Sequence, residues 1–187
     1  MAVKDEADAL LYDFNLLGIL EKFGKVYITG SYFMDLMVWN DLDVYIEDNE
    51  TSRSNFYILI GEICTELKPS RLDGMAGDKG WFFGFETYAT GGRWNVDIWL
   101  KNKDEIKSAQ ESCAKTARLI NDRPECRKAV MDIKENLIEQ RLYGFDKLPA
   151  HYHSGDVYNA VLNEDARTYD EFLMLFPKNK RSPCERN

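Results

Sequence analysis

The sequence lacks the cysteine spacing of a disulfide framework and the long apolar run of a membrane span. Its four cysteines are widely spaced and form no Cys-x-x-Cys pair: Cys64, Cys113, Cys126 and Cys184. This pattern is typical of reduced thiols in a cytosolic protein. No apolar run approaches the roughly 18 residues of a membrane span, and the acidic N-terminus lacks a signal-peptide pattern. We therefore expect no membrane association and a cytoplasmic location.

An excess of positive charge is also absent. The 187 residues include 24 basic and 32 acidic side chains, which gives a net charge of −8. A general binder of nucleic-acid backbones needs a basic face, so we expect no general nucleic-acid binding, and a template-using polymerase is disfavoured. With 44% apolar and 13% aromatic residues, the composition is that of a globular chain.

Histidine is scarce, since His151 and His153 are the only two in the chain. A zinc site needs a third and a fourth ligand, and no Cys or further His lies at a conventional spacing from this pair. The two histidines could belong to a loop that contacts a substrate, or they could be an incidental exposed pair.

Two aspartates one residue apart are the most informative feature that is present. Asp41 and Asp43 begin the β-prone segment DLDVYI. Side chains alternate along a strand, so Asp41, Asp43 and Tyr45 share one face while apolar residues occupy the other. Neighbouring carboxylates repel each other and resist burial, so a fold that keeps them on one face usually supplies a cation. The alternative is the exposed face of an ordinary amphipathic strand.

A strand, a glycine-serine pair and a helix-compatible run precede these aspartates. The β-prone residues 25–29 end at Gly30-Ser31, and an apolar run follows. This order places backbone N–H groups and a hydroxyl at a helix N-terminus, where a phosphate binds well. Ser31 could also cap that helix. Further along, residues 94–100 alternate so that Asp97 lies opposite the apolar face, where it would join the pair if the two strands are neighbours.

This ordered set resembles the signature of the DNA polymerase beta-like nucleotidyltransferase superfamily. The resemblance covers residues 25–100, and the segment GSYFMDL is most similar to the small bacterial lincosamide and aminoglycoside nucleotidyltransferases. It implies an α/β (α+β) fold in which helices flank a small mixed sheet. The chain departs from the family pattern at Thr29, where a small apolar residue is usual. It also lacks the Arg or Lys that often directly precedes the paired acids.

The resemblance implies metal-binding and catalytic roles for three carboxylates, Asp41, Asp43 and Asp97. They would hold Mg²⁺, with two ions expected, and Asp97 would lie nearer the acceptor. Gly30 and Ser31 would bind the phosphates of ATP or of another nucleoside triphosphate.

A cation for the triphosphate has to come from elsewhere in the chain. Lys79 and Arg93 flank an aromatic, β-prone hairpin and are the candidate cofactor-binding cations, together with Lys101 and Lys103. Taken singly, each of these cations is more commonly a solvated surface charge. The aromatic residues close to the acids could stack on a base or an acceptor ring, or they could belong to the core: Tyr32, Trp39, Tyr45 and Trp99.

Helical periodicity dominates the remaining sequence. Helices are expected over residues 5–23, 56–67, 103–121, 124–143, 154–162 and 168–176, with a loop or loose hairpin at 69–80 and strands at 81–88 and 94–100. We expect a single domain over residues 1–176, with a core at about 20–121, a C-terminal helical part at about 122–176 and a disordered tail at 177–187.

The sequence thus predicts a Mg²⁺-dependent nucleotidyltransferase. It would move a nucleoside monophosphate from ATP or another nucleotide to a hydroxyl of an antibiotic-like small molecule or a protein, with release of pyrophosphate. The alternative is a non-catalytic module of the same fold that binds a nucleotide or a protein partner, as an antitoxin does. The missing cation favours the module, and the three acids favour the enzyme. The hairpin around Trp81-Phe82-Phe83 could pair two copies as a homodimer, or it could be core.

Overall fold

The computed structural model describes residues 2–77, 80–143 and 152–177. The chain divides into two compact units, Met1–Ala114 and Lys115–Asn187, and the division falls within one helix. Lys79, His151 and the tail from residue 178 onward lie outside the described residues.

Unit 1 contains the sheet and the helices of the N-terminal part of the chain. Its elements are α1 (Val3–Asp8), the π-helix η1 (Ala9–Asp13), α2 (Leu16–Glu21), β1 (Val26–Ile28), α3 (Gly30–Phe33), β2 (Asp41–Glu47), α4 (Glu50–Ser54), α5 (Phe56–Leu67), β3 (Arg71–Met75), β4 (Trp81–Thr87), β5 (Trp94–Lys101) and the first part of α6 (Lys103–Asn121). Unit 2 contains the end of α6, then α7 (Pro124–Glu139), α8 (Ser154–Asn163) and α9 (Tyr169–Leu175).

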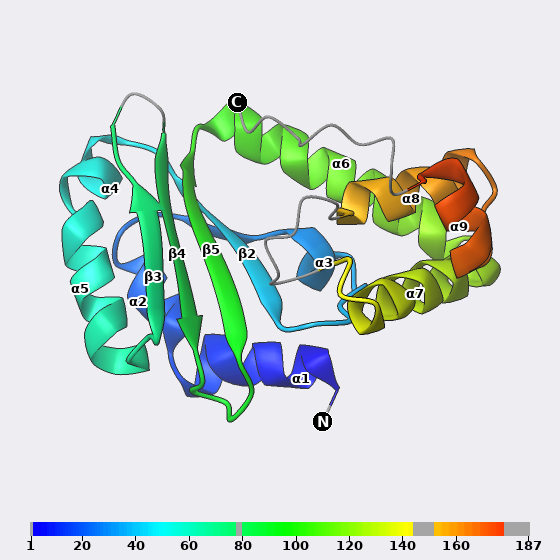
Figure 1. The fold of residues 1–187 in the computed structure, drawn as a ribbon. Coiled ribbons are helices and arrows are strands. Elements are labelled where there is room, and N and C mark those ends of the chain that lie inside the picture. Colours follow the sequence, from blue (N-terminus) through cyan, green and yellow to red (C-terminus); the bar gives the residue numbers. More distant parts are fainter. Residues whose placement is uncertain (1, 78–79, 144–151, 178–187) are drawn as a thin grey trace. The chain divides into compact units, whose positions relative to one another are not determined.

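A five-stranded mixed sheet with the order β1-β2-β5-β4-β3 organises unit 1. Strands β3, β4, β5 and β2 run side by side from left to right in Figure 1. Of the four neighbouring strand pairs in this described sheet, β2 and β5 are parallel and the other three are antiparallel. The mixed sheet with helices confirms the expected fold class, and the parallel pair makes the two aspartate-bearing strands neighbours.

One face of the sheet is apolar and forms the core of unit 1. Val44 of β2 and Ile98 of β5 are fully buried, as are the other residues that alternate with them. Residues of η1, α2 and α5 belong to the same buried cluster, among them Leu10, Leu20 and Ile63. Because alternate side chains of a strand point to opposite faces, burial of this set leaves the aspartates on the other face.

The helix predicted over residues 5–23 is wrong in one respect, because the structure divides it into α1, η1 and α2. Asn15 adopts the left-handed backbone conformation with a φ of 57°, which a continuous right-handed helix does not contain. The periodic apolar pattern survives, since both halves place their leucines in the core.

Two other predicted elements differ from the structure. The segment 69–80, expected as a loop or loose hairpin, contains the strand β3, which pairs antiparallel with β4. The helix expected to reach residue 143 ends at Glu139, and Gln140 follows it as the C-cap. The helix over 103–121 has the expected bounds, and Thr168 caps α9 by accepting a hydrogen bond from the Glu171 N–H.

Unit 2 packs α7, α8 and α9 around apolar side chains such as Val130, Val157 and Phe172. None of the helices in the described part of the chain combines the length and the apolar character that a membrane span requires.

A lysine is fully buried within unit 2. The Lys134 ammonium of α7 donates to the Tyr158 hydroxyl at 3.2 Å and lies over the rings of Tyr143 and Tyr158, 5.8 and 5.3 Å from their centroids. Aromatic faces attract a cation through their quadrupole, which offsets part of the cost of removing the ammonium from water.

Two isoleucines of α5 test which face of this helix stabilises unit 1. Ile63 is fully buried, whereas Ile58 is 57% exposed. We expect Ile63→Ala to lower the free energy of unfolding by about 2–5 kcal/mol, because it removes buried methyl groups and leaves a cavity. Ile58→Ala, the matched control, should change it by less than about 1 kcal/mol. Urea unfolding measures both, and equal losses would contradict the packing described here.

Candidate active site

The register of β2 and β5 sets two of the aspartates side by side. Asp43 lies directly opposite Asp97 in the parallel pair, and Asp41 lies opposite Asn95. Neighbouring strands are about 4.8 Å apart, and paired residues point to the same face. The expectation that Asp97 joins Asp41 and Asp43 on one side of the sheet is therefore confirmed for the backbone. We call this side, defined by the three aspartates, the acidic face.

The same register continues across the whole sheet and forms a row through Asp43. The Thr29 N–H donates to the Asp43 carbonyl at 3.0 Å, Asp97 pairs with Gly84, and Gly84 pairs with Asp73. The row therefore runs from β1 to β3, with Asp43 and Asp97 adjacent and the glycine beside them.

Two glycines leave room around these carboxylates. A Cβ placed on Gly30 would lie 2.3 Å from Asp43 Oδ2, and one on Gly84 would lie 2.9 Å from Asp97 Oδ1. Gly30 also has a φ of +61°, a conformation that glycine adopts without strain. The glycine-serine turn thus comes within contact distance of the Asp43 carboxylate, as the resemblance implies.

Asn95 also lies on the acidic face, although the sequence pattern alone does not single it out. Its Nδ2 donates to Asp41 Oδ1 at 2.7 Å, so the amide orients that carboxylate. A signal was present in the sequence, because Asn95 stands two residues before Asp97 and therefore shares its face. Only the register shows that it lies opposite Asp41.

Two polar contacts connect the residues that follow the glycine-serine turn with α1. The Tyr32 hydroxyl donates to Asp8 Oδ1 at 2.6 Å, and Lys4 pairs with Asp35 at 3.2 Å. Burial, followed by the hydrogen bond to Asp8, raises the pKa of Tyr32. The N-cap of α3 is Thr29 and not Ser31, so the capping role expected for the serine is wrong.

Tyr45 and Cys113 border the acidic face beside Asp43. Burial is the main cause that raises the pKa of Tyr45, and the negative charge of Asp43 adds to it. The Cys113 thiol of α6 lies 3.6 Å from the Thr29 hydroxyl, a distance compatible with a sulfur hydrogen bond. Trp99, on the same face, packs against Phe82 with the ring centroids 4.4 Å apart and the planes tilted by 37°.

Arg93, a candidate phosphate-binding cation, forms an ion pair with Glu86. Its Nε and Nη2 donate to the two carboxylate oxygens of Glu86 at 3.1 and 2.7 Å, and Arg71 approaches the same carboxylate at 3.4 Å. The hydrogen bond from Arg93 is the main cause that lowers the pKa of Glu86. Lys101 and Lys103 are likewise paired, with Glu105 and Glu47. Lys79 is not among the described residues, and the role of Arg93 toward phosphate stays a prediction.

The acidic face has the type of ligand that a magnesium ion needs, but its carboxylates are not grouped closely enough to form a ready metal site. Carboxylate oxygens are the ligands that Mg²⁺ prefers, and Gly30 leaves space beside one of them. As the side chains stand, however, the described residues contain no group of three or more His, Cys, Asp or Glu that could hold a metal ion.

The chain matches no protein-family model and no curated protein sequence. It is similar to solved structures that include the polymerase core of TRAMP, an RNA surveillance complex, at 19% identity and a TM-score of 0.55, covering 79% of this chain and 45% of that one. The Cid1 poly(U) polymerase with bound MgGTP has 16% identity and a TM-score of 0.62, covering 86% and 49%. Terminal uridylyl transferase 4 from Trypanosoma brucei with bound UPU has 13% identity and a TM-score of 0.56, and the match covers 90% of this chain and 64% of that one.

These similarities show that the chain has the fold seen in nucleotidyltransferases. The chain spans about half the length of the first two proteins. The fold agrees with the superfamily that the motifs of residues 25–100 resemble.

Adding a methyl group at Gly30 tests how closely the turn approaches Asp43. Gly30→Ala should destabilise the protein by at least about 1–2 kcal/mol, because the left-handed conformation alone costs an L-residue that much. Its Cβ would also meet the Asp43 carboxylate. Gly61→Ala is the control, because a Cβ there meets nothing within 4 Å and alanine favours the α5 helix. Denaturant unfolding should therefore give opposite signs for the two variants, and equal signs would contradict the close approach.

The Glu86 ion pairs should make stability depend on pH. Because the folded-state pKa of Glu86 is lowered, its contribution is fully present above the unfolded value, about 4.3, and is lost as the pH falls through the folded value. Glu86→Gln should cost on the order of 1 kcal/mol at pH 7, and the difference from the original protein should shrink below pH 4. Thermal unfolding between pH 3 and pH 7 measures this, with the exposed Glu66→Gln as control. A difference that is constant across this range would exclude the ion-pair origin.

Proposed function

We propose that this protein is a Mg²⁺-dependent nucleotidyltransferase that uses ATP or another nucleoside triphosphate. The observation that carries the proposal is the register that sets Asp43 opposite Asp97, with Gly30 in contact with Asp43. The fold that the chain shares with solved nucleotidyltransferases supports it. The neighbouring structures are described with Mg and nucleotides bound, which supports the same kind of cofactor here.

In the proposed reaction, an acceptor hydroxyl oxygen attacks the α-phosphorus of the triphosphate, the bond to the β-phosphate oxygen breaks, and pyrophosphate leaves. Bound Mg²⁺ supplies charge neutralisation of the phosphates and activation of the attacking oxygen. Asp41, Asp43 and Asp97 would hold the cations, and Asp97 would also take the proton of the acceptor hydroxyl. Gly30 and Ser31 contact the β- and γ-phosphates through backbone N–H groups and a hydroxyl.

Asn95 positions Asp41 in this scheme. Its amide donates to one carboxylate oxygen at 2.7 Å, which restricts the rotation of the carboxyl group. Positioning of this kind matters because phosphoryl chemistry depends mainly on geometry and charge stabilisation.

The acceptor that we propose is a hydroxyl of a small molecule or of a protein. The net charge of −8 supports this choice, because it opposes long contacts with a nucleic-acid backbone. The similar structures are of a poly(U) polymerase, a terminal uridylyl transferase and the polymerase core of an RNA surveillance complex. The 3′-hydroxyl of RNA is therefore the acceptor against which the proposal is tested.

A second candidate is a non-catalytic nucleotide-binding or protein-interaction module of the same fold. Two observations favour it. The described residues form no ready metal-binding group, and Arg93, Lys101 and Lys103 are each paired with a glutamate. Against it, mutually repelling carboxylates kept on one face bring a pure binding protein no benefit.

Nucleotide-dependent stabilisation tests the proposed site. In Mg²⁺, the correct triphosphate at 100 times its dissociation constant should stabilise the original protein by about 2.7 kcal/mol, seen as a rise in Tm. Asp43→Asn should lose most of this response, because it removes a cation ligand. Asp13→Asn, an exposed aspartate of η1, is the matched control and should keep it. A response without Mg²⁺, or one that survives Asp43→Asn, would contradict the assignment.

Transfer of label from α-labelled triphosphates then separates the enzyme from the binding module. The reaction should release one pyrophosphate for each labelled acceptor and should stop in Asp97→Asn. Stabilisation by Mg²⁺-nucleotide without transfer to RNA, protein or small-molecule hydroxyls would support the module. Transfer to RNA alone would correct the acceptor.

A further inference from the structure

We propose that the outer edge of β3 is a self-association surface, on which β3 of a second copy pairs antiparallel and joins the two sheets. The proposal is independent of the nucleotidyl-transfer chemistry. The sequence suggested a homodimer through the aromatic hairpin around residues 81–83, but Phe83 is buried in the core of unit 1. The edge strand offers a different surface.

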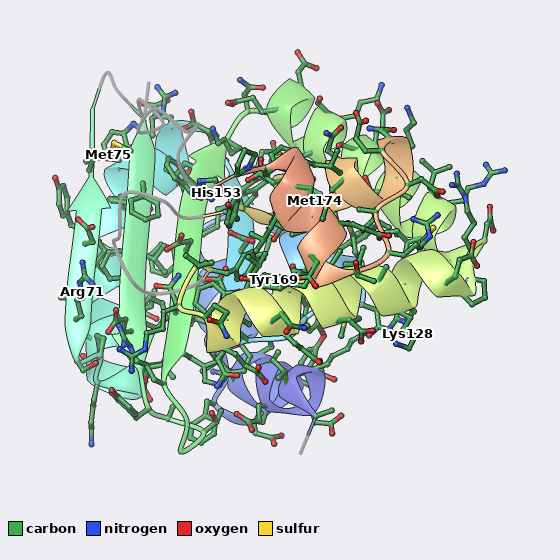
Figure 2. The ribbon with its side chains drawn as sticks, turned by 45° about the vertical axis from the view of Figure 1, so that its right-hand side comes forward. Arg71, Met75, Lys128, His153, Tyr169 and Met174 are labelled. Carbon is green, nitrogen blue, oxygen red and sulfur yellow. The ribbon has the colours of Figure 1, made fainter. Side chains whose placement is uncertain are left out.

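Strand β3 ends the sheet among the strands that the structure describes. All five of its residues are exposed, including Leu72 at 49% and Met75 at 40%. Figure 2 shows Arg71 and Met75 on this outermost strand. An edge strand presents a row of backbone N–H and C=O groups, and these pair readily with another strand unless something blunts the edge. No proline or lysine interrupts residues 71–75.

Charge selects one register for this pairing. A two-fold axis perpendicular to the sheet keeps each face on its own side, so odd-numbered residues pair with odd-numbered ones. An axis through Arg71 would set two arginines face to face, and an axis through Asp73 would do the same with two aspartates. An axis through Leu72 sets Arg71 opposite the partner's Asp73, twice in the dimer. Like charges opposite each other destabilise a sheet and unlike charges stabilise it.

The neighbours of Leu72 suit this register as well. Ser70 would face the partner's Gly74, where no side chain interferes, and Pro69, which has no N–H, would end the ladder. Arg71 is already held by Glu86 at 3.4 Å and its side chain is 44% exposed, so it would lie between Glu86 and the partner's Asp73. The two acidic faces would then lie on the same side of one continuous sheet.

The size of the contact sets its strength. Pairing of two five-residue edges buries less than the roughly 1,200 Å² of a stable interface, so the dimer should be weak and concentration-dependent. Because its charge pairs are exposed, it should also weaken as salt is added.

A charge swap tests the partner and the register together. Sedimentation of the 21.7 kDa chain should show concentration-dependent dimerisation below about 1 mM. Arg71→Asp alone and Asp73→Arg alone should each abolish it, because like charges then face each other. An equimolar mixture of the two variants should associate again, and the double variant Arg71→Asp/Asp73→Arg should regain self-association. Both positions are exposed, but Arg71→Asp also removes the ion pair with Glu86, so circular dichroism and thermal unfolding of each variant must show that the fold is kept.

Cysteine cross-linking locates the axis independently. Leu72→Cys should give a disulfide-linked dimer under mild oxidation, because the axis brings the two residues within bridging distance. Met75→Cys, on the same strand with the same native thiols, should not, because three residues on each side of the axis place the two thiols about 20 Å apart. A chain that stays monomeric, single variants that still dimerise, or equal cross-linking at both positions would overturn the proposal.

Discussion

The parallel pairing of β2 with β5 is the constraint on which the candidate site depends. A slip of one residue in either strand would move its aspartates to the opposite face. That face is filled by fully buried residues such as Val44 and Ile98, and an unpaired carboxylate there would cost several kcal/mol. The apolar core therefore fixes the register, and the register in turn sets Asp43 opposite Asp97.

The adjacent carboxylates of Asp43 and Asp97 repel each other, and the fold surrounds the acidic face with glycines and a hydrogen-bond donor. Gly30 and Gly84 leave room beside Asp43 and Asp97, and Asn95 donates to Asp41. Arg93 and Arg71 pair with Glu86, which lies opposite Asn95 on the same face. Carboxylates gathered on one face attract a divalent cation and, through it, a triphosphate.

The charged residues show most clearly how far sequence patterns reach. The alternation of residues 41–46 and 94–100 correctly predicts which side chains share a face, because alternation is a local property of the strand. The same patterns do not predict that Arg93 pairs with Glu86, that Asn95 holds Asp41 or that Lys134 is buried against tyrosines. Each of these contacts joins residues that the fold brings together.

The sequence by itself determined most of the helices and strands, the faces of the strands and the glycine-serine turn ahead of an acidic pair. Periodicity and turn chemistry act within a few residues, which is why Thr168 caps α9 and the helix over 103–121 has the expected bounds. Only the tertiary structure decided the strand order, the partner of each charge and the break at Asn15. These depend on packing between distant segments, where several arrangements satisfy the same local pattern and the burial of the whole core selects one.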